Sequence, residues 1–183
     1  MAVEIPTEIG IDEILVRFIS DRNFKNKVID LTKLVTKDLF FPYKGGVSLQ
    51  RATFLDENGC KFFAKKVGGR KFVGFIIFKK DKFEEIKASF IKDNNAEFDA
   101  QIVATPLDEN YNYIIDFDKI FTNDKGNPSH SDIKYFNPEV KEEVPNSTIR
   151  SFSRKFSKVC KTTLDNTEVD DLAFNGDKFI DII

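Results

Sequence analysis

Apolar side chains in the first forty residues recur at the spacing of a helix. A pattern of i, i+3, i+4, i+7 and i+8 places side chains on one face of an α-helix, and it is met by Ile11, Ile14, Leu15, Phe18 and Ile19. A comparable pattern follows from Phe24 to Val35. The spacing predicts two short helices, or one interrupted helix, over residues 11–38. Pro42 ends this part because proline lacks the backbone N–H that a helix needs.

Three stretches rich in β-branched and apolar residues, 47–55, 71–78 and 98–105, predict strands of one sheet. The second is apolar almost throughout, which is typical of a strand covered on both faces. Residues 111–121 are compatible with a strand or with a short helix, and both alternatives stay open. The pattern therefore indicates a mixed or antiparallel sheet between residues 47 and 121.

A helix is indicated between the first two strands. Asp56 can cap its first turn, and the pair Gly68-Gly69 favours its end. The apolar stripe of this helix comprises Cys60, Phe63, Ala64 and Val67. Three lysines fall off the stripe, so we expect them to face solvent, and these are Lys61, Lys65 and Lys66.

Residues 147–161 have the clearest helical pattern of the chain. At 100° per residue, apolar side chains gather on one side and basic side chains on the other. The apolar side carries Ile149, Phe152, Phe156, Val159 and Cys160. The basic side carries Arg150, Arg154, Lys158 and Lys161.

These elements predict a single α+β domain, since 183 residues exceed a typical domain of about 150 only slightly. Residues 122–147 are rich in Asn, Asp, Gly, Pro and Ser, which favours a long connection. The expected parts are a helical N-terminal part at 1–43, a sheet core at 44–121, a late amphipathic helix at 147–161, and an acidic tail or last packed element at 165–183.

Several classes of protein are excluded by simple features. The longest apolar run covers residues 73–78, whereas a membrane span needs about 20 residues. The acidic first residues do not match a secretory signal. Cys60 and Cys160 form neither a disulfide framework nor a CxxC zinc motif, and His130 is the only histidine. We therefore expect an intracellular, cytoplasmic protein with no cofactor and no structural metal.

The net charge of −2 conceals blocks of opposite sign along the chain. Residues 44–92 carry +7, residues 93–146 carry −8, residues 147–161 carry +5 and residues 162–183 carry −5. Such blocks can attract a polyanion or a basic protein, although they can also neutralise one another in the fold.

Basic and aromatic residues alternate through residues 44–92, and the chain contains 20 Phe. Nucleic-acid strands are bound by cations that contact phosphates and by rings on which bases stack. The alternative is that the Phe residues form the core and the Lys residues its solvated rim. The candidate contacts are Lys61, Lys65, Lys66, Arg70, Lys71, Lys79 and Lys80, together with Arg150, Arg154 and Lys158 of the late helix.

The other motifs give weaker indications of function. His130 lies between serines and near Asp132, but no GxSxG turn accompanies it, so we interpret it as a surface or loop-stabilising residue. Glu85 and Lys87 match half of a metal-dependent nuclease motif, yet they fall in a charged piece that we expect to be turn or helix. Asp116 and Asp118 share one face if their segment is extended, without the spacing of a calcium loop. The paired glycines do not form a phosphate-binding loop, and both cysteines are expected to be small apolar residues.

A basic, Phe-rich body followed by an acidic, aromatic tail resembles the layout of single-stranded DNA-binding proteins. The tail departs from that layout because it ends in Ile182-Ile183, and no motif assigns the chain to that family. The leading hypothesis is a non-enzymatic protein that contacts nucleic acid through its basic surfaces. The alternative is a partner-binding inhibitor, immunity or adaptor protein of microbial or phage origin, which docks its acidic surface on a basic protein. A metal-dependent nuclease comes third.

Overall fold

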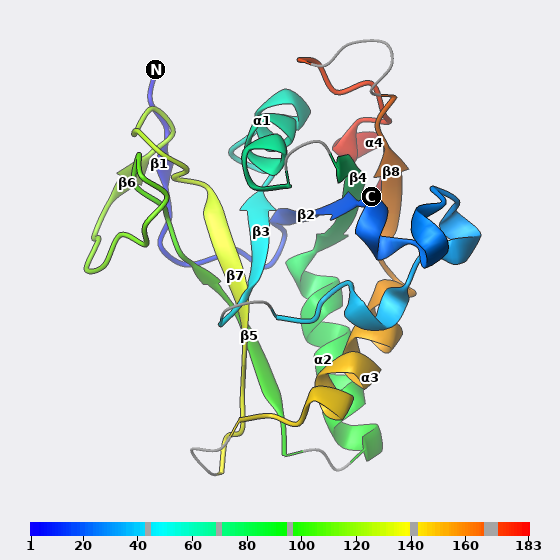
Figure 1. Ribbon diagram of the computed structural model, residues 1–183. Helices are drawn as coiled ribbons and strands as arrows, with labels where there is room; N and C mark the ends of the chain where they lie inside the picture. The colour runs from blue at the N-terminus through cyan, green and yellow to red at the C-terminus, as the bar shows by residue number, and fades with distance from the viewer. Residues whose placement is uncertain (43–44, 69–70, 95–96, 140–142, 167–171) are drawn as a thin grey trace.

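The computed structural model describes residues 1–42, 45–68, 71–94, 97–139, 143–166 and 172–183. Its centre is a six-stranded sheet in the order β5-β7-β3-β2-β4-β8, in which every neighbouring pair is antiparallel (Figure 1). The strands are β2 (Ile14–Ser20), β3 (Val47–Arg51), β4 (Phe72–Lys79), β5 (Asp99–Ala104), β7 (His130–Phe136) and β8 (Lys161–Leu164). Helices together with this sheet confirm the predicted α+β fold.

Helices cover both faces of the sheet. On one face lie α2 (Lys80–Asn94) and α3 (Asn146–Ser157), which enclose the larger core. On the other face α1 (Glu57–Gly68) and the short α4 (Phe179–Ile182) pack on β2 and β4. The part of this second face formed by β3 and β7 is left for other segments to cover.

The larger core is built mainly from phenylalanine rings. Phe83 lies edge-on to Phe156 at 5.3 Å between ring centroids, and Phe156 stacks on Phe152 at 5.7 Å. Phe90 and Phe98 continue this cluster between α2 and β5. Edge-to-face and offset pairs of this kind stabilise beyond their buried area. Here the abundance of Phe serves the core.

The prediction of helices over residues 11–38 is wrong for its first half. Residues 14–20 form β2, which lies between β3 and β4, and its side chains Leu15, Val16 and Ile19 are buried on alternate faces. A strand covered on both faces can carry apolar residues at every position, so a helical spacing arose by coincidence. Residues 21–38 contain four short 3-10 turns, Asp21–Asn23, Lys25–Lys27, Leu31–Lys33 and Thr36–Asp38.

The prediction of a long connection over residues 122–147 is also wrong. Residues 130–136 form β7, an inner strand that pairs with β3 on one side and β5 on the other. Before it, residues 105–129 form an extension beside the sheet, which we call the arm (Figure 1). Within the arm β6 (Ile120–Phe121) pairs with β1 (Glu4–Ile5), so residues 111–121 are neither one helix nor one strand.

The other predicted elements are confirmed with small shifts. α1 begins after Asp56, whose carboxylate accepts a hydrogen bond from the Gly59 amide at 2.7 Å. The strands at 47–51, 72–79 and 99–104 overlap the stretches that predicted them. The helix predicted over 147–161 is confirmed for most of its length but ends at Ser157, and Lys161 is instead the first residue of β8. The described part of the C-terminal segment is a packed element, because Phe174 and Phe179 both contact Phe75.

A buried ion pair ties the N-terminal segment to the sheet. Arg51 of β3 is fully buried and donates to both carboxylate oxygens of Glu13, at 2.8 and 2.6 Å. The same guanidinium donates to the backbone carbonyls of Pro6, at 2.6 Å, and Glu8, at 3.3 Å. A planar guanidinium can serve all these acceptors at once. The segment that carries β1 is thereby held against β3.

Candidate functional site

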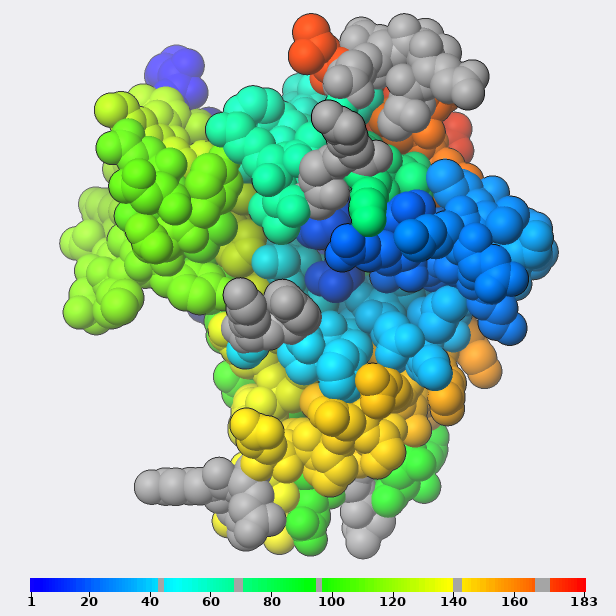
Figure 2. All heavy atoms as spheres, viewed as in Figure 1, coloured from blue at the N-terminus to red at the C-terminus, as the bar shows by residue number. Residues whose placement is uncertain are grey.

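The candidate site is a pocket of about 530 Å³ between α1 and the arm. Its floor is the face of β2, β3 and β7 that α1 leaves uncovered. In Figure 2 the arm and α1 stand as two raised masses on either side of this part of the sheet. Its apolar walls include Val16, Phe18, Phe63, Ala64, Val67, Phe75 and Leu107. Its polar groups belong to Ser48, Gln50, Lys66, Tyr111, Tyr113, Asn127 and His130.

Ser48 and His130 form a hydrogen-bonded pair in the floor. The two residues lie on adjacent strands, and Ser48 Oγ is 2.8 Å from His130 Nε2. His130 Nδ1 lies 2.8 Å from the carbonyl oxygen of Thr105. A carbonyl oxygen only accepts, so Nδ1 carries the hydrogen and donates it. Nε2 is then free of hydrogen and accepts the Ser48 hydroxyl proton.

Burial keeps His130 in its neutral form. The residue is only 4% exposed, and this loss of solvation lowers the pKa of its imidazole below the usual 6.5. The carboxylate of Asp132 and the hydrogen bond to Thr105 act in the opposite direction without reversing the shift. Lys134 acts with burial, because a nearby cation disfavours the imidazolium.

A cluster centred on the carboxylate of Asp132 lies beside the pair of Ser48 and His130. Asp132 is 1% exposed and accepts hydrogen bonds from the hydroxyls of Tyr113, at 2.9 Å, and Thr105, at 3.1 Å. Lys134 Nζ is 3.5 Å from the same carboxylate. Burial, with a contribution from Asp132, raises the pKa of Tyr113 to about 12, so Tyr113 remains a protonated donor. The cluster holds the Tyr113 ring 6.2 Å from the His130 ring.

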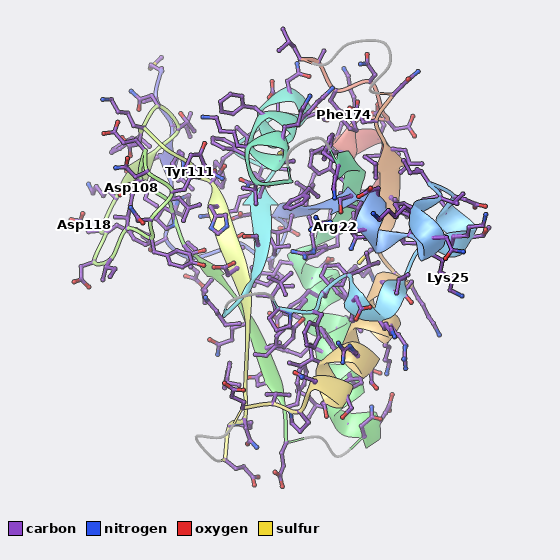
Figure 3. All side chains as sticks on the ribbon, in the orientation of Figure 1. Arg22, Lys25, Asp108, Tyr111, Asp118 and Phe174 are labelled. Atoms are coloured by element: carbon purple, nitrogen blue, oxygen red, sulfur yellow. The ribbon has the colours of Figure 1, made fainter. Side chains whose placement is uncertain are left out.

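The mouth of the pocket carries a cation between two rings. Lys66 Nζ lies 4.5 Å from the ring centroid of Phe62 on α1 and 5.4 Å from that of Tyr111 on the arm. Figure 3 shows Tyr111 on the side of the arm that faces α1. Phe62 is 53% exposed and Val67 is 66% exposed, which leaves an apolar rim beside the cation. Contacts of this kind hold an ammonium through the ring quadrupole.

Among the residues that the structure describes, the cations predicted to bind nucleic acid do not form one surface. Lys61 is a correction: we expected it in solvent, but it is fully buried, 2.9 Å from Asp165. Lys66 lines the pocket, Lys65 and Lys71 are half-buried near the same end of the sheet, and Arg70 lies outside the described residues.

The remaining candidate cations lie away from the pocket. Lys79 and Lys80 are at the other end of β4, where Lys80 donates to the carbonyl of Ile9 at 2.7 Å. Arg150 pairs with Asp38 at 3.0 Å and lies over the ring of Phe41. Arg154 and Lys158, at the end of α3, are exposed on the opposite side of the sheet from α1. Of the candidate cations in the described part of the chain, Lys66 lines the pocket, and Lys65 and Lys71 lie near it.

The acidic and thiol candidates do not assemble a site in the described residues. Glu85 and Lys87 lie on α2, where Glu85 pairs with Lys82 at 2.6 Å and Lys87 with Glu84 at 2.7 Å. Asp116 and Asp118 are exposed on the arm, and Figure 3 shows Asp118 on its outer side. No three His, Cys, Asp or Glu residues in the described ranges are placed to hold a metal ion. Burial raises the pKa of both Cys60 and Cys160, as befits the small apolar residues expected there.

His130 is the second correction among the candidate residues. We expected a surface or loop-stabilising histidine, but it is buried in an inner strand and reaches the pocket floor. Its partner Ser48 is 82 residues away in sequence and meets it only through the pairing of β3 with β7, so no local motif marks the pair. The one available signal was the alternation of polar Ser48 and Gln50 with apolar residues in the first predicted strand, which placed both on one face.

No family model, curated protein or solved structure matches the chain. Among the described helices, none is both long and apolar enough to cross a membrane. The function is therefore inferred from the geometry of the pocket and of its surroundings.

Proposed function

We propose that the protein binds single-stranded nucleic acid across the mouth of the pocket, with one unpaired base entering between α1 and the arm. The observation that carries this proposal is the ammonium of Lys66 held between the rings of Phe62 and Tyr111, directly above a pocket of about 530 Å³. A cation beside aromatic faces is the combination that nucleic-acid strands require.

The lining of the pocket supports a planar polar ligand. Pockets for small ligands have volumes of about 300–1,000 Å³ and combine apolar walls with a few polar groups. Here aromatic walls offer stacking faces, and Gln50, Asn127 and Ser48 offer groups that hydrogen-bond to the edge of a base. The Gln50 carbonyl oxygen is withdrawn from solvent without a hydrogen-bond partner, so it can accept from an amino group of a bound base.

The charges of the arm and of α1 favour one path for a bound nucleic-acid strand. The arm carries exposed carboxylates, among them Glu109, Asp116 and Asp118, which repel phosphates. α1 presents Lys66 on the other side of the mouth, with Lys65 and Lys71 nearby. A strand that follows α1 therefore keeps its phosphates near cations and away from the arm. A base within a duplex is stacked and paired, so entry into the pocket favours a single strand.

The second candidate function is a partner-binding protein that acts through the arm. Ile115 is 81% exposed at the surface of the arm, between the carboxylates of Asp116 and Asp118 and those of Asp108 and Glu109 in sequence. An exposed apolar residue among acidic residues suits a basic protein partner with an apolar contact.

Fluorescence polarisation with labelled single-stranded and duplex oligonucleotides, measured over a salt series, tests the proposal. We expect tighter binding of single strands, weakened by salt, and a loss of at least tenfold in affinity for Lys66→Glu and for Tyr111→Ala. Lys158→Glu is the matched charge reversal on α3 and is expected to change affinity little. Absence of binding at about 50 mM salt, where electrostatic affinity is strong, would refute the proposal and leave the partner-binding function.

A further inference from the structure

We infer that Ser48 is a nucleophile, activated by His130, that accepts the acyl group of a small carboxylic ester bound in the pocket. This inference goes beyond strand binding and does not rest on it. It begins from two consecutive hydrogen bonds, from Ser48 Oγ to His130 Nε2 at 2.8 Å and from His130 Nδ1 to the Thr105 carbonyl at 2.8 Å.

These two bonds meet the requirements for an activated serine. A serine nucleophile needs a neighbouring base within about 2.6–3.2 Å, and the base needs a third group that fixes its tautomer and orientation. The Thr105 carbonyl is that third group, because it obliges Nδ1 to donate and leaves Nε2 as the acceptor. A backbone carbonyl here takes the place that a carboxylate holds in a Ser-His-Asp triad.

Asp132 acts on His130 indirectly, through the hydroxyl of Thr105. Its carboxylate does not bond to the imidazole but accepts a hydrogen bond from the Thr105 hydroxyl, which itself lies 3.0 Å from Nδ1. A carboxylate in this position favours the imidazolium that forms during proton transfer, as its upward effect on the pKa of His130 indicates. We therefore assign Asp132 as a positioning residue.

The pair faces open space. Both Ser48 and His130 line the pocket of about 530 Å³, together with Tyr113 and Asn127. A serine and a histidine that only stabilised the sheet would have no need of a cavity above them. Two neighbouring strands hold them, since Gln50 pairs with His130 and Ser48 with Asp132 across β3 and β7. This backbone support gives the preorganised geometry that a catalytic pair needs.

The lining favours an ester over a phosphoryl group. Phosphoryl transfer needs several cations or a metal around the transferred group, and Lys66 is the only Lys or Arg among the lining residues that the structure describes. Phe18, Phe63 and Leu107 make much of the remaining surface apolar, which suits an ester with an aromatic or alkyl group. The Asn127 side chain is 2% exposed at the floor and can donate to the oxyanion through its amide nitrogen.

The proposed hydrolysis takes two steps, acylation of Ser48 and then attack by water on the acyl-serine. Ser48 Oγ attacks the ester carbonyl carbon while its proton passes to His130 Nε2. The bond from that carbon to the alcohol oxygen then breaks, and the leaving oxygen takes the proton from Nε2. Water next attacks the acyl-serine, gives one proton to Nε2, and releases the carboxylic acid as Ser48 Oγ recovers its hydrogen.

Labelling with a fluorophosphonate probe tests the inference in the absence of nucleic acid. Ser48 Oγ displaces fluoride from phosphorus, and the serine proton leaves with the fluoride by way of His130. Intact-mass and peptide-mapping spectrometry should find one adduct, on Ser48, in the native protein. Ser48→Ala should give no adduct, whereas Ser131→Ala should label like the native protein. Ser131 is a matched control because it is a buried serine at the adjacent position to His130, on the opposite face of β7.

The base is tested separately. His130→Gln should slow labelling by at least 100-fold while thermal melting shows that the fold persists. If His130→Gln does not fold, the pH profile of the native protein decides: the rate should be flat near neutrality and fall as His130 becomes protonated below its pKa. Asp132, Lys134 and Tyr113 are the titratable groups around His130, and Tyr113 stays protonated because burial raises the pKa of its hydroxyl to about 12. An adduct elsewhere, no adduct, or a rate indifferent to both His130→Gln and pH would overturn the inference.

Discussion

The ammonium of Lys61 on α1 lies 2.9 Å from the carboxylate of Asp165, and both side chains are withdrawn from solvent. Lys61 also donates to the backbone carbonyl of Ala173. The contact therefore joins the middle of α1 to two points of the C-terminal segment, one on each side of residues 167–171. A lysine that the helical pattern assigned to solvent instead anchors the end of the chain.

Substitution of this lysine is expected to destabilise the protein strongly. Lys61→Ala leaves the Asp165 carboxylate buried without its cation, and the loss of one member of a buried ion pair costs about 3–5 kcal/mol. Urea unfolding of Lys61→Ala measures the change in the free energy of unfolding. The exposed Lys158→Ala is the control and should change it by less than about 0.5 kcal/mol.

The double variant Lys61→Met, Asp165→Leu should recover most of that loss. It removes both charges together, and apolar side chains of similar size often replace a buried ion pair at little cost. A double variant as unstable as Lys61→Ala would show that Lys61 contributes through its bond to Ala173, and that the ion pair itself adds little.

Protonation of His130 is expected to make stability depend on pH. Burial lowers the pKa of His130 in the folded protein, while the unfolded chain keeps a value near 6.5. Between these two values the unfolded state binds more protons than the folded state, so stability falls as pH falls below about 6.5 and is fully present above it. Urea unfolding at pH 8, 7, 6 and 5 should show this slope, and His130→Gln should remove it. Equal slopes in both proteins would assign the effect to other groups.

Removal of the cation at the mouth should change how salt acts on strand binding. Each phosphate contact to a single strand contributes about 0.7 to the slope of log K against log salt. Lys66→Ala should therefore lower the magnitude of that slope by about this amount, because it removes one contact. Lys66→Arg should retain the slope. If Lys66→Ala weakens binding with an unchanged slope, Lys66 holds the rings of Phe62 and Tyr111 in place and does not touch a phosphate.

Gly126 at the base of the arm should tolerate no side chain. Its φ of +88° lies in the region that favours glycine, and a Cβ there would stand 2.2 Å from the carbonyl oxygen of Leu107. The neighbouring Asn127 exchanges two backbone hydrogen bonds with Leu107, at 3.0 and 2.9 Å. Gly126→Ala should cost about 1–3 kcal/mol and move the pocket wall. Urea unfolding measures the first effect, and the rate at which the fluorophosphonate probe labels Ser48 reports the second.

The sequence predicts those elements whose amphipathic pattern is local. α1 and α3 follow from their apolar stripes, and β4 follows from a run that is apolar on both faces. β2 could not be recognised because a strand buried on both faces loses its alternation and matched a helical spacing. β7 was hidden by the polar residues His130, Ser131 and Asp132, which are buried there only because the arm and other strands cover them.

Less of the candidate site than of the fold could be predicted from the sequence. Lys66 was identified from its place on the polar side of α1, but Ser48 and His130 meet only through the pairing of β3 with β7. Tyr113 reaches them through the path of the arm, which no periodic pattern describes. A site assembled from three distant segments depends on the topology of the sheet, and that topology was beyond the reach of local patterns.

The arm is connected to β5 at its beginning and to β7 at its end, and it has a third attachment through β6. β6 of the arm pairs with β1, and the residues just after β1 are held by Arg51, which donates to the Pro6 carbonyl and to Glu13. Arg51 belongs to β3, the strand that also carries Ser48. The arm, which forms one wall of the pocket, is thereby connected through β1 to a guanidinium on the face of β3 opposite to Ser48. A substitution at Arg51 is therefore expected to change the width of the pocket from a distance, through the N-terminal segment that carries β1.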